Sequence, residues 1–102
     1  MEKQVNNFIH NFKALHPKEI EESFLYGNCY WFAHILTTRF DGDIVYLPIE
    51  NHFLALIDQK FYDISGKVEP TTKWVYWTDF QRRAPLESKR IIKQCIEKKE
   101  QI

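Results

Sequence analysis

Three residues far apart in this sequence have side chains that together could perform nucleophilic chemistry: Cys29, His52 and Asp63. Cys29 follows the turn-forming pair Gly27-Asn28 and opens an apolar segment with helical spacing. The first turn of a helix presents unpaired N–H groups and the positive end of the helix dipole, which favour a thiolate. A cysteine, a histidine and an aspartate, each on its own element, are the residues that a thiol hydrolase uses.

The chemistry of such a site assigns a role to each residue. Cys29 would attack a carbonyl carbon, His52 would accept the thiol proton, and Asp63 would hold the other imidazole nitrogen. The backbone N–H of Cys29 is a candidate oxyanion donor, and the side chains of Asn28 and Tyr26 are weaker candidates. The alternative is that Cys29 is a buried apolar residue and His52 a polar residue at a strand end. Asp63 favours the catalytic interpretation, because an acid within an apolar strand needs a partner.

Helical periodicity dominates the first forty residues. Apolar residues at helical spacing predict an amphipathic helix over residues 2–15, which His16-Pro17 interrupts. A shorter helix is expected after it, closed by Gly27. Asn28 is a suitable N-cap for a third helix, which carries Cys29 and ends at Asp41-Gly42.

Short apolar runs replace the helical pattern from residue 43 onward. They predict antiparallel strands over residues 44–47, 53–57 and 61–64. If residues 58 and 59 form a two-residue turn, His52 and Asp63 lie on the same face of the sheet. Both faces of this hairpin are apolar, which predicts a central position with a cover on each side.

The last third of the chain gives weaker signals. Residues 67–73 are expected to form a polar connection, and Asp79 is expected to cap a single turn. Pro85 is expected to start a C-terminal helix. The apolar stripe of that helix consists of Leu86, Ile91, Ile92, Cys95 and Ile96.

An aromatic run precedes that helix, and residues 74–77 could be either a strand or a loop. Trp74, Tyr76 and Trp77 are candidates for binding a partner. The favoured alternative is that they complete the core. Stacking on nucleic acid is disfavoured for the same reason.

Composition narrows the function classes. With 102 residues the chain is expected to be one domain, residues 1–102. Lys and Arg number 14 and Asp and Glu number 14, so no net field attracts nucleic acid. No apolar run approaches the roughly 18 residues that span a bilayer, and no signal peptide is evident, which predicts a cytoplasmic protein. Cys29, His52 and Asp63 provide three metal ligands without a fourth, so neither a metal nor a cofactor is expected.

The order of these residues resembles the papain-like superfamily of cysteine peptidases, amidases and transglutaminases. More closely, Gly27-Asn28-Cys29-Tyr30-Trp31-Phe32-Ala33, His52-Phe53 and Tyr62-Asp63 with Gly66 resemble small proteins encoded by phages and prophages of Gram-positive bacteria. The resemblance covers about residues 24 to 97. Papain-type enzymes carry a glutamine before the nucleophile as an oxyanion donor, whereas Glu21, Glu22 and Ser23 occupy that region here.

These observations predict an α+β fold with a small papain-like core. A central helix is expected to pack on a short antiparallel sheet, with helices flanking it at both ends of the chain. The predicted function is a phage-type cysteine hydrolase that acts on an amide or thioester bond of a protein or peptide. The alternative is a catalytically silent phage protein that binds and inhibits a host defence protein, as an anti-CRISPR does, or a host regulatory protein. The oligomeric state is left open.

Overall fold

The computed structural model of the chain describes residues 1–15 and 29–100, apart from the side chains of residues 29 and 95–100. Within these residues the helices are α1 (Glu2–Ala14), α3 (Cys29–Phe40), α4 (Trp77–Arg83) and α5 (Pro85–Glu100). The strands are β1 (Asp43–Leu47), β2 (His52–Ile57), β3 (Lys60–Asp63), β4 (Gly66–Val68) and β5 (Val75–Tyr76). They form one antiparallel sheet in the order β4-β3-β2-β1-β5. The predicted α+β class is confirmed.

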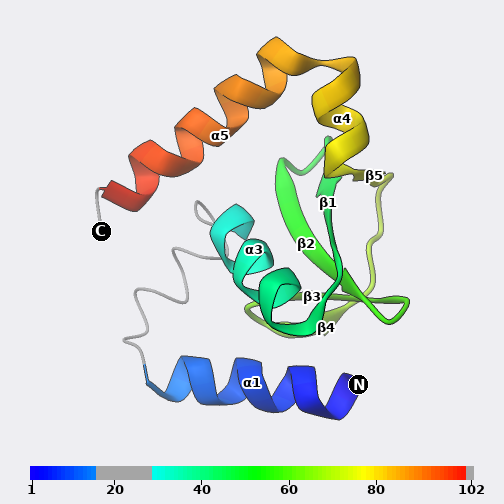
Figure 1. Cartoon of the computed structure of the whole chain (residues 1–102), viewed down its shortest axis with the longest axis vertical. Helices are drawn as coiled ribbons and strands as arrows, with labels where there is room; N and C mark the ends of the chain where they lie inside the picture. Colours follow the sequence, from blue (N-terminus) through cyan, green and yellow to red (C-terminus); the bar gives the residue numbers. More distant parts are fainter. Residues whose placement is uncertain (16–28, 101–102) are drawn as a thin grey trace.

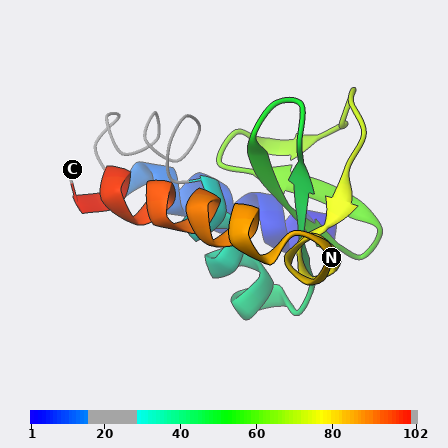
Figure 2. The ribbon, with the colours of Figure 1, turned by 90° about the horizontal axis from the view of Figure 1, so that it is seen from above.

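The helices gather on one side of the strands. In Figure 1, α3 lies against the middle of the sheet, α1 runs beneath it, and α5 extends diagonally from α4. The view from above shows the strands rising on one side of the band that the helices form (Figure 2). Within the described ranges, no helix is both long enough and apolar enough to cross a membrane.

The sheet has two faces that differ in what covers them. We call the face against α3 the helix face; its strand residues are Tyr46, Phe53, Ala55, Ile57 and Tyr62. We call the opposite face the pocket face; its strand residues include Val45, Leu47, Leu54, Leu56 and Phe61. Val68 and Trp74 also pack on the pocket face. The predicted central position of the hairpin is confirmed, but the cover is uneven, because Leu54 is buried on the pocket face whereas Leu56 and Phe61 are half-buried.

The β2–β3 hairpin has the predicted two-residue turn. Asp58 and Gln59 both adopt left-handed conformations, with φ values of 52° and 67°. Two consecutive residues at positive φ are typical of the type I′ turn, whose twist matches that of the flanking strands. The resulting register pairs Ala55 with Tyr62, which places Leu54 across from Asp63. The predicted register is thus confirmed.

The end of α3 is set by two adjacent residues, as predicted. Asp41 leaves the helical conformation with a φ of 59°. A Cβ at Gly42 would clash with the backbone carbonyl of Leu56. Only glycine therefore lets the chain pass this close to the end of β2 and enter β1.

Two predictions for the C-terminal half need correction, and one that was left open is decided. The expected connection over residues 67–73 in fact starts within β4, a strand too short to show periodicity. Residues 74–77, left open between strand and loop, contribute the two-residue strand β5 and then begin α4. Asp79 lies in the first turn of α4, while the residue at the N-cap position is Tyr76. Asp79 is therefore not a cap.

The flanking helices follow the predictions with two exceptions. Helix α1 buries Val5 and Ile9, but Leu15 is exposed. Helix α5 starts at Pro85 and buries Ile91, but Leu86 is 82% exposed and does not belong to its apolar stripe. The shorter helix predicted between Pro17 and Gly27, together with the side chains of Cys95 and Ile96, lies outside the described residues.

Candidate active site

The structure brings His52 and Asp63 together on the pocket face. His52 is the first residue of β2 and Asp63 the last residue of β3. Side chains alternate between the two faces along a strand. His52 lies two residues before Leu54 on β2, and Asp63 lies across from Leu54 on β3, so all three side chains project from the pocket face. The Nε2 atom of His52 lies 3.1 Å from the Oδ2 atom of Asp63. This is the pairing that the hairpin register predicted.

Asp63 is a buried carboxylate whose other oxygen is also hydrogen-bonded. Its Oδ1 atom accepts a hydrogen bond of 2.8 Å from the backbone N–H of Ser65 and another from the Ser65 hydroxyl. Burial alone would raise the pKa of Asp63, but the hydrogen bonds from His52 and Ser65 outweigh it and lower this pKa. Asp63 is therefore ionised at neutral pH and can orient an imidazole.

The pair opens into a small pocket of about 180 Å³. Its apolar walls come from the sheet and from the connection after β4: Leu47, Leu54, Val68 and Pro70. Glu50, Glu69 and Thr71 complete the lining, so the titratable side chains of the pocket are His52 and three carboxylates, Glu50, Asp63 and Glu69. The volume is below the roughly 300 Å³ at which drug-sized ligand sites usually begin. The pocket suits a single side chain or a short chain segment.

The helix that carries Cys29 begins at the same end of the sheet as β2. Cys29 is the first residue of α3, and the ring of the next residue, Tyr30, packs edge-on against Phe53 at 5.2 Å between centroids. Phe53 directly follows His52 but projects from the helix face. The Cys29 side chain, Asn28 and Tyr26 lie outside the described residues, so the thiol–imidazole distance and the oxyanion donors stay predictions.

The three candidate partner-binding aromatics have different environments. Trp77 is only 3% exposed and packs between Tyr46 and Phe53, so it belongs to the core and is not available to a partner. Trp74 is half-buried on the pocket face. Tyr76 is 41% exposed and is the accessible member of this group. The alternative that the aromatics complete the core thus holds for Trp77.

Ser65 is a site residue that the sequence reasoning missed. The signal was present, because serine two residues after aspartate commonly closes a local turn through side-chain hydrogen bonds. Glu50 and Glu69 were missed for another reason. They reach the pocket from two connections whose paths the strand pattern does not determine.

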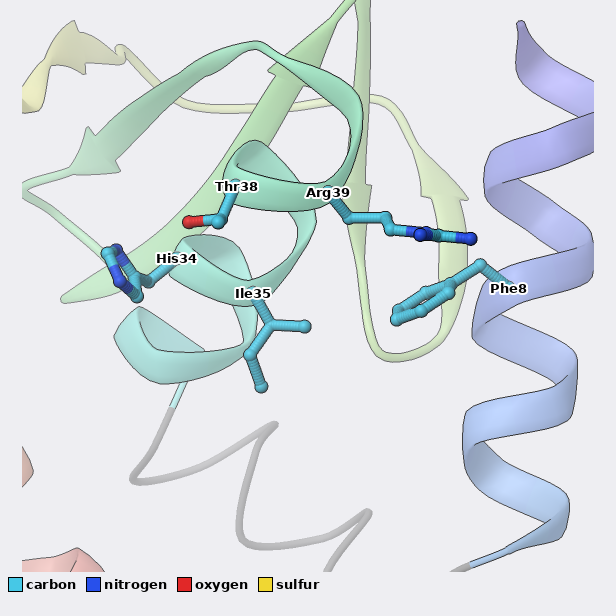
Figure 3. Close-up of a pocket in the computed structure, with 5 residues that line it drawn as sticks. All are labelled: Phe8, His34, Ile35, Thr38 and Arg39. Carbon is cyan, nitrogen blue, oxygen red and sulfur yellow. The ribbon is translucent and has the colours of Figure 1, made fainter.

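A wider hollow of about 510 Å³ lies between α1 and α3 (Figure 3). Arg39 extends from α3 so that its guanidinium lies over the ring of Phe8, 5.9 Å from the centroid. The other described residues that line the hollow are His34, Ile35 and Thr38. These residues bring no carboxylate to His34, so this hollow lacks the acid–base pair found on the sheet.

Among residues 1–15 and 30–94, no group of three His, Cys, Asp or Glu side chains is arranged to hold a metal ion. The family model described as phage YunG-like protein matches residues 8–97 of the chain. This range includes the whole hairpin and the start of α3. No curated protein and no solved structure matches the chain.

Proposed function

The chain belongs to the phage YunG-like protein family, and we propose that it is a cysteine hydrolase that cleaves an amide or thioester bond. Cys29 is the nucleophile, His52 the general base and Asp63 the residue that orients the imidazole. The observation that supports this proposal is the 3.1 Å contact between His52 Nε2 and the buried, ionised Asp63. Proteins use such pairs to set the tautomer of a catalytic histidine.

In this proposal the two ring nitrogens of His52 have separate roles. Because Nε2 donates to Asp63, Nδ1 is the atom that takes the thiol proton in the proposed reaction. The thiolate then adds to the carbonyl carbon, and His52 returns the proton to the leaving group as the carbon–nitrogen or carbon–sulfur bond breaks. Water, deprotonated by His52, hydrolyses the acyl-thioester and regenerates the thiol.

The proposal requires a particular route of approach. Helix α3 packs on the helix face, whereas the imidazole projects from the pocket face. His52 is the first residue of β2, and the turn over residues 48–51 joins it to β1 at this end of the sheet. The thiol must therefore reach the imidazole around this end of the sheet. The contact between Tyr30 and Phe53 already holds the start of α3 beside that end.

Alkylation kinetics test this assignment without knowledge of the substrate. At pH 6 an ordinary thiol with a pKa near 8.5 is only about 0.3% ionised. We expect iodoacetamide to label Cys29 at least about ten-fold faster than Cys95 at this pH, measured by mass spectrometry of the intact protein and its peptides. His52→Ala should remove the difference, and Cys95 in the same molecule serves as the internal control. Equal and slow labelling of both cysteines would contradict the proposal.

A second candidate function has one observation in its favour, the presence of exposed apolar side chains. Ile49 is 77% exposed in the turn between β1 and β2, and Tyr76 is also accessible. Such residues suit a protein that inhibits a host protein by binding it. Cys29→Ala separates the two functions, because a hydrolase loses its cellular effect and a binder keeps it. If binding is the activity, Ile49→Ser should abolish the cellular effect.

A further inference from the structure

We propose that Ser65 is a positioning residue that holds the Asp63 carboxylate in the orientation needed to bind His52. The inference rests on the proposed function for its catalytic meaning. Its structural basis is that one residue donates two hydrogen bonds to one oxygen. The backbone N–H and the hydroxyl of Ser65 both reach Oδ1 of Asp63, while Oδ2 faces Nε2 of His52.

This division of the two oxygens restricts the carboxylate. A carboxylate on a short side chain can rotate about its Cβ–Cγ bond and exchange its oxygens between partners. Two donors from Ser65 on one oxygen oppose that rotation, because any turn of the group breaks both hydrogen bonds. Hydrogen bonds to an ionised acceptor are about twice as strong as neutral ones. Ser65 therefore directs Oδ2 toward the imidazole.

The local backbone explains how Ser65 reaches this position. Residues 64 and 65 form the turn between β3 and β4, and Asp63 pairs across it with Gly66. Gly66 has a φ of 110°, a conformation that glycine adopts without strain. The turn thus folds Ser65 back over the carboxylate two residues before it. Ser65 itself is exposed, so its substitution leaves no cavity in the core.

The Ser65 hydroxyl also contributes to the charge state of Asp63. The described titratable groups that share the pocket with Asp63 are His52 on β2, Glu50 before β2 and Glu69 after β4. Burial opposes ionisation, whereas His52 and Ser65 favour it and the net pKa of Asp63 is lowered. Removal of the hydroxyl deletes one favourable contact and leaves burial unchanged. The pKa of Asp63 must then move upward.

The test compares Ser65→Ala with Ser65→Thr and a control. Threonine keeps the hydroxyl, whereas alanine removes it. Ser88→Ala is the matched control, because Ser88 donates its hydroxyl to the Pro85 carbonyl in α5, away from the pocket. The full-length variants are first compared by circular dichroism, and the Asp63 carboxyl is then titrated by carbon-13 NMR. We expect the Asp63 midpoint to move to higher pH in Ser65→Ala, to return in Ser65→Thr, and to stay unchanged in Ser88→Ala.

The pH profile of Cys29 alkylation is the second measurement. Near pH 5, Ser65→Ala should slow labelling by up to about ten-fold, a factor that corresponds to about 1.4 kcal/mol. Ser65→Thr should recover most of the rate. An unchanged Asp63 midpoint in Ser65→Ala would overturn the positioning role. A shifted midpoint in a protein whose Cys29 is no more reactive than Cys95 would support that role and refute the hydrolase proposal, so the two failures are distinct.

Discussion

Neighbouring residues of the central hairpin belong to opposite faces of the sheet and have different surroundings. On β2, His52 lines the pocket, whereas Phe53 is 1% exposed and packs beneath α3. On β3, Asp63 lines the pocket, whereas Tyr62 is fully buried on the helix face. The alternation of side chains along a strand produces both contrasts.

The comparison shows how a chain of this size can hold both a core and a polar site on the same strands. The helix face contacts α3 through large aromatic and aliphatic residues, which belong to the larger of the two buried apolar clusters. The pocket face has a smaller apolar cluster and can accommodate the ionised Asp63 carboxylate with its hydrogen bond to His52. Substitutions on the helix face should therefore change stability alone, and those at the His52–Asp63 pair on the pocket face should change reactivity as well.

The largest effect is expected at Phe53. Phe53→Ala removes a ring that packs against Tyr30, Tyr46 and Trp77, and should lower the free energy of unfolding by about 3–5 kcal/mol. Urea denaturation followed by fluorescence measures the loss. A decrease below about 1 kcal/mol would mean that the helix face is not the principal core.

Asp63→Asn should have an intermediate effect on stability, about 2 kcal/mol at pH 7, since an amide replaces an ionised acceptor of three hydrogen bonds. The amide also presents a donor where His52 needs an acceptor. We expect Cys29 alkylation at pH 6 to fall together with stability. Normal stability combined with normal alkylation would contradict the claim that the pocket face determines the reactivity of Cys29.

The stability of the wild-type protein should also depend on pH through Asp63, and Asp63→Asn is the comparison. The pKa of Asp63 is lower in the folded protein than its ordinary value near 3.9, so its ionisation stabilises the fold above that pH. This stability is lost as the pH falls through the folded-state pKa. Wild-type protein should therefore lose more stability than Asp63→Asn between pH 5 and pH 2, as measured by urea midpoints across this range.

Tyr62→Phe should stabilise the protein by about 1 kcal/mol. The Tyr62 hydroxyl is buried and has no hydrogen-bond partner among the residues that the structure describes, and burial raises its pKa. Phenylalanine keeps the ring and removes the unsatisfied group. The thermal midpoint should rise without a change in Cys29 labelling. A fall in the midpoint would show that the hydroxyl has a partner.

The smallest effect is expected at the hairpin turn. Gln59 has a left-handed φ of 67°, which costs a non-glycine residue about 1–2 kcal/mol, while glycine adds chain entropy to the unfolded state. Gln59→Gly should therefore stabilise the hairpin by about 0.5 kcal/mol, with the pairing of Ala55 and Tyr62 retained. Urea midpoints measure the gain, and cross-strand NOEs report the register. A register slip would exchange the faces and abolish Cys29 reactivity.

The sequence was most informative where periodicity and turn chemistry agree. The extent of α3 and the three-strand meander followed from spacing together with turn and cap residues. The shared face of His52 and Asp63 followed from the expected two-residue turn at residues 58 and 59. Strand β4 was missed because three residues are too few to show alternation. The burial of Trp77 depends on tertiary contacts with Tyr46 and Phe53, which no local pattern encodes. The same limit applies to Glu69, which meets the pocket through a connection without regular structure.

The position of His52 and Asp63 within one hairpin has a consequence for folding kinetics. The two residues are separated by 11 positions, and the strands between them pair through a two-residue turn. Contacts of such low sequence separation require little loop closure, and hairpins form within about 1–10 µs. Strand β5, in contrast, joins β1 from about thirty residues away along the chain. We therefore expect the acid–base pair to form in an early intermediate or transition state, before the sheet acquires its last strand.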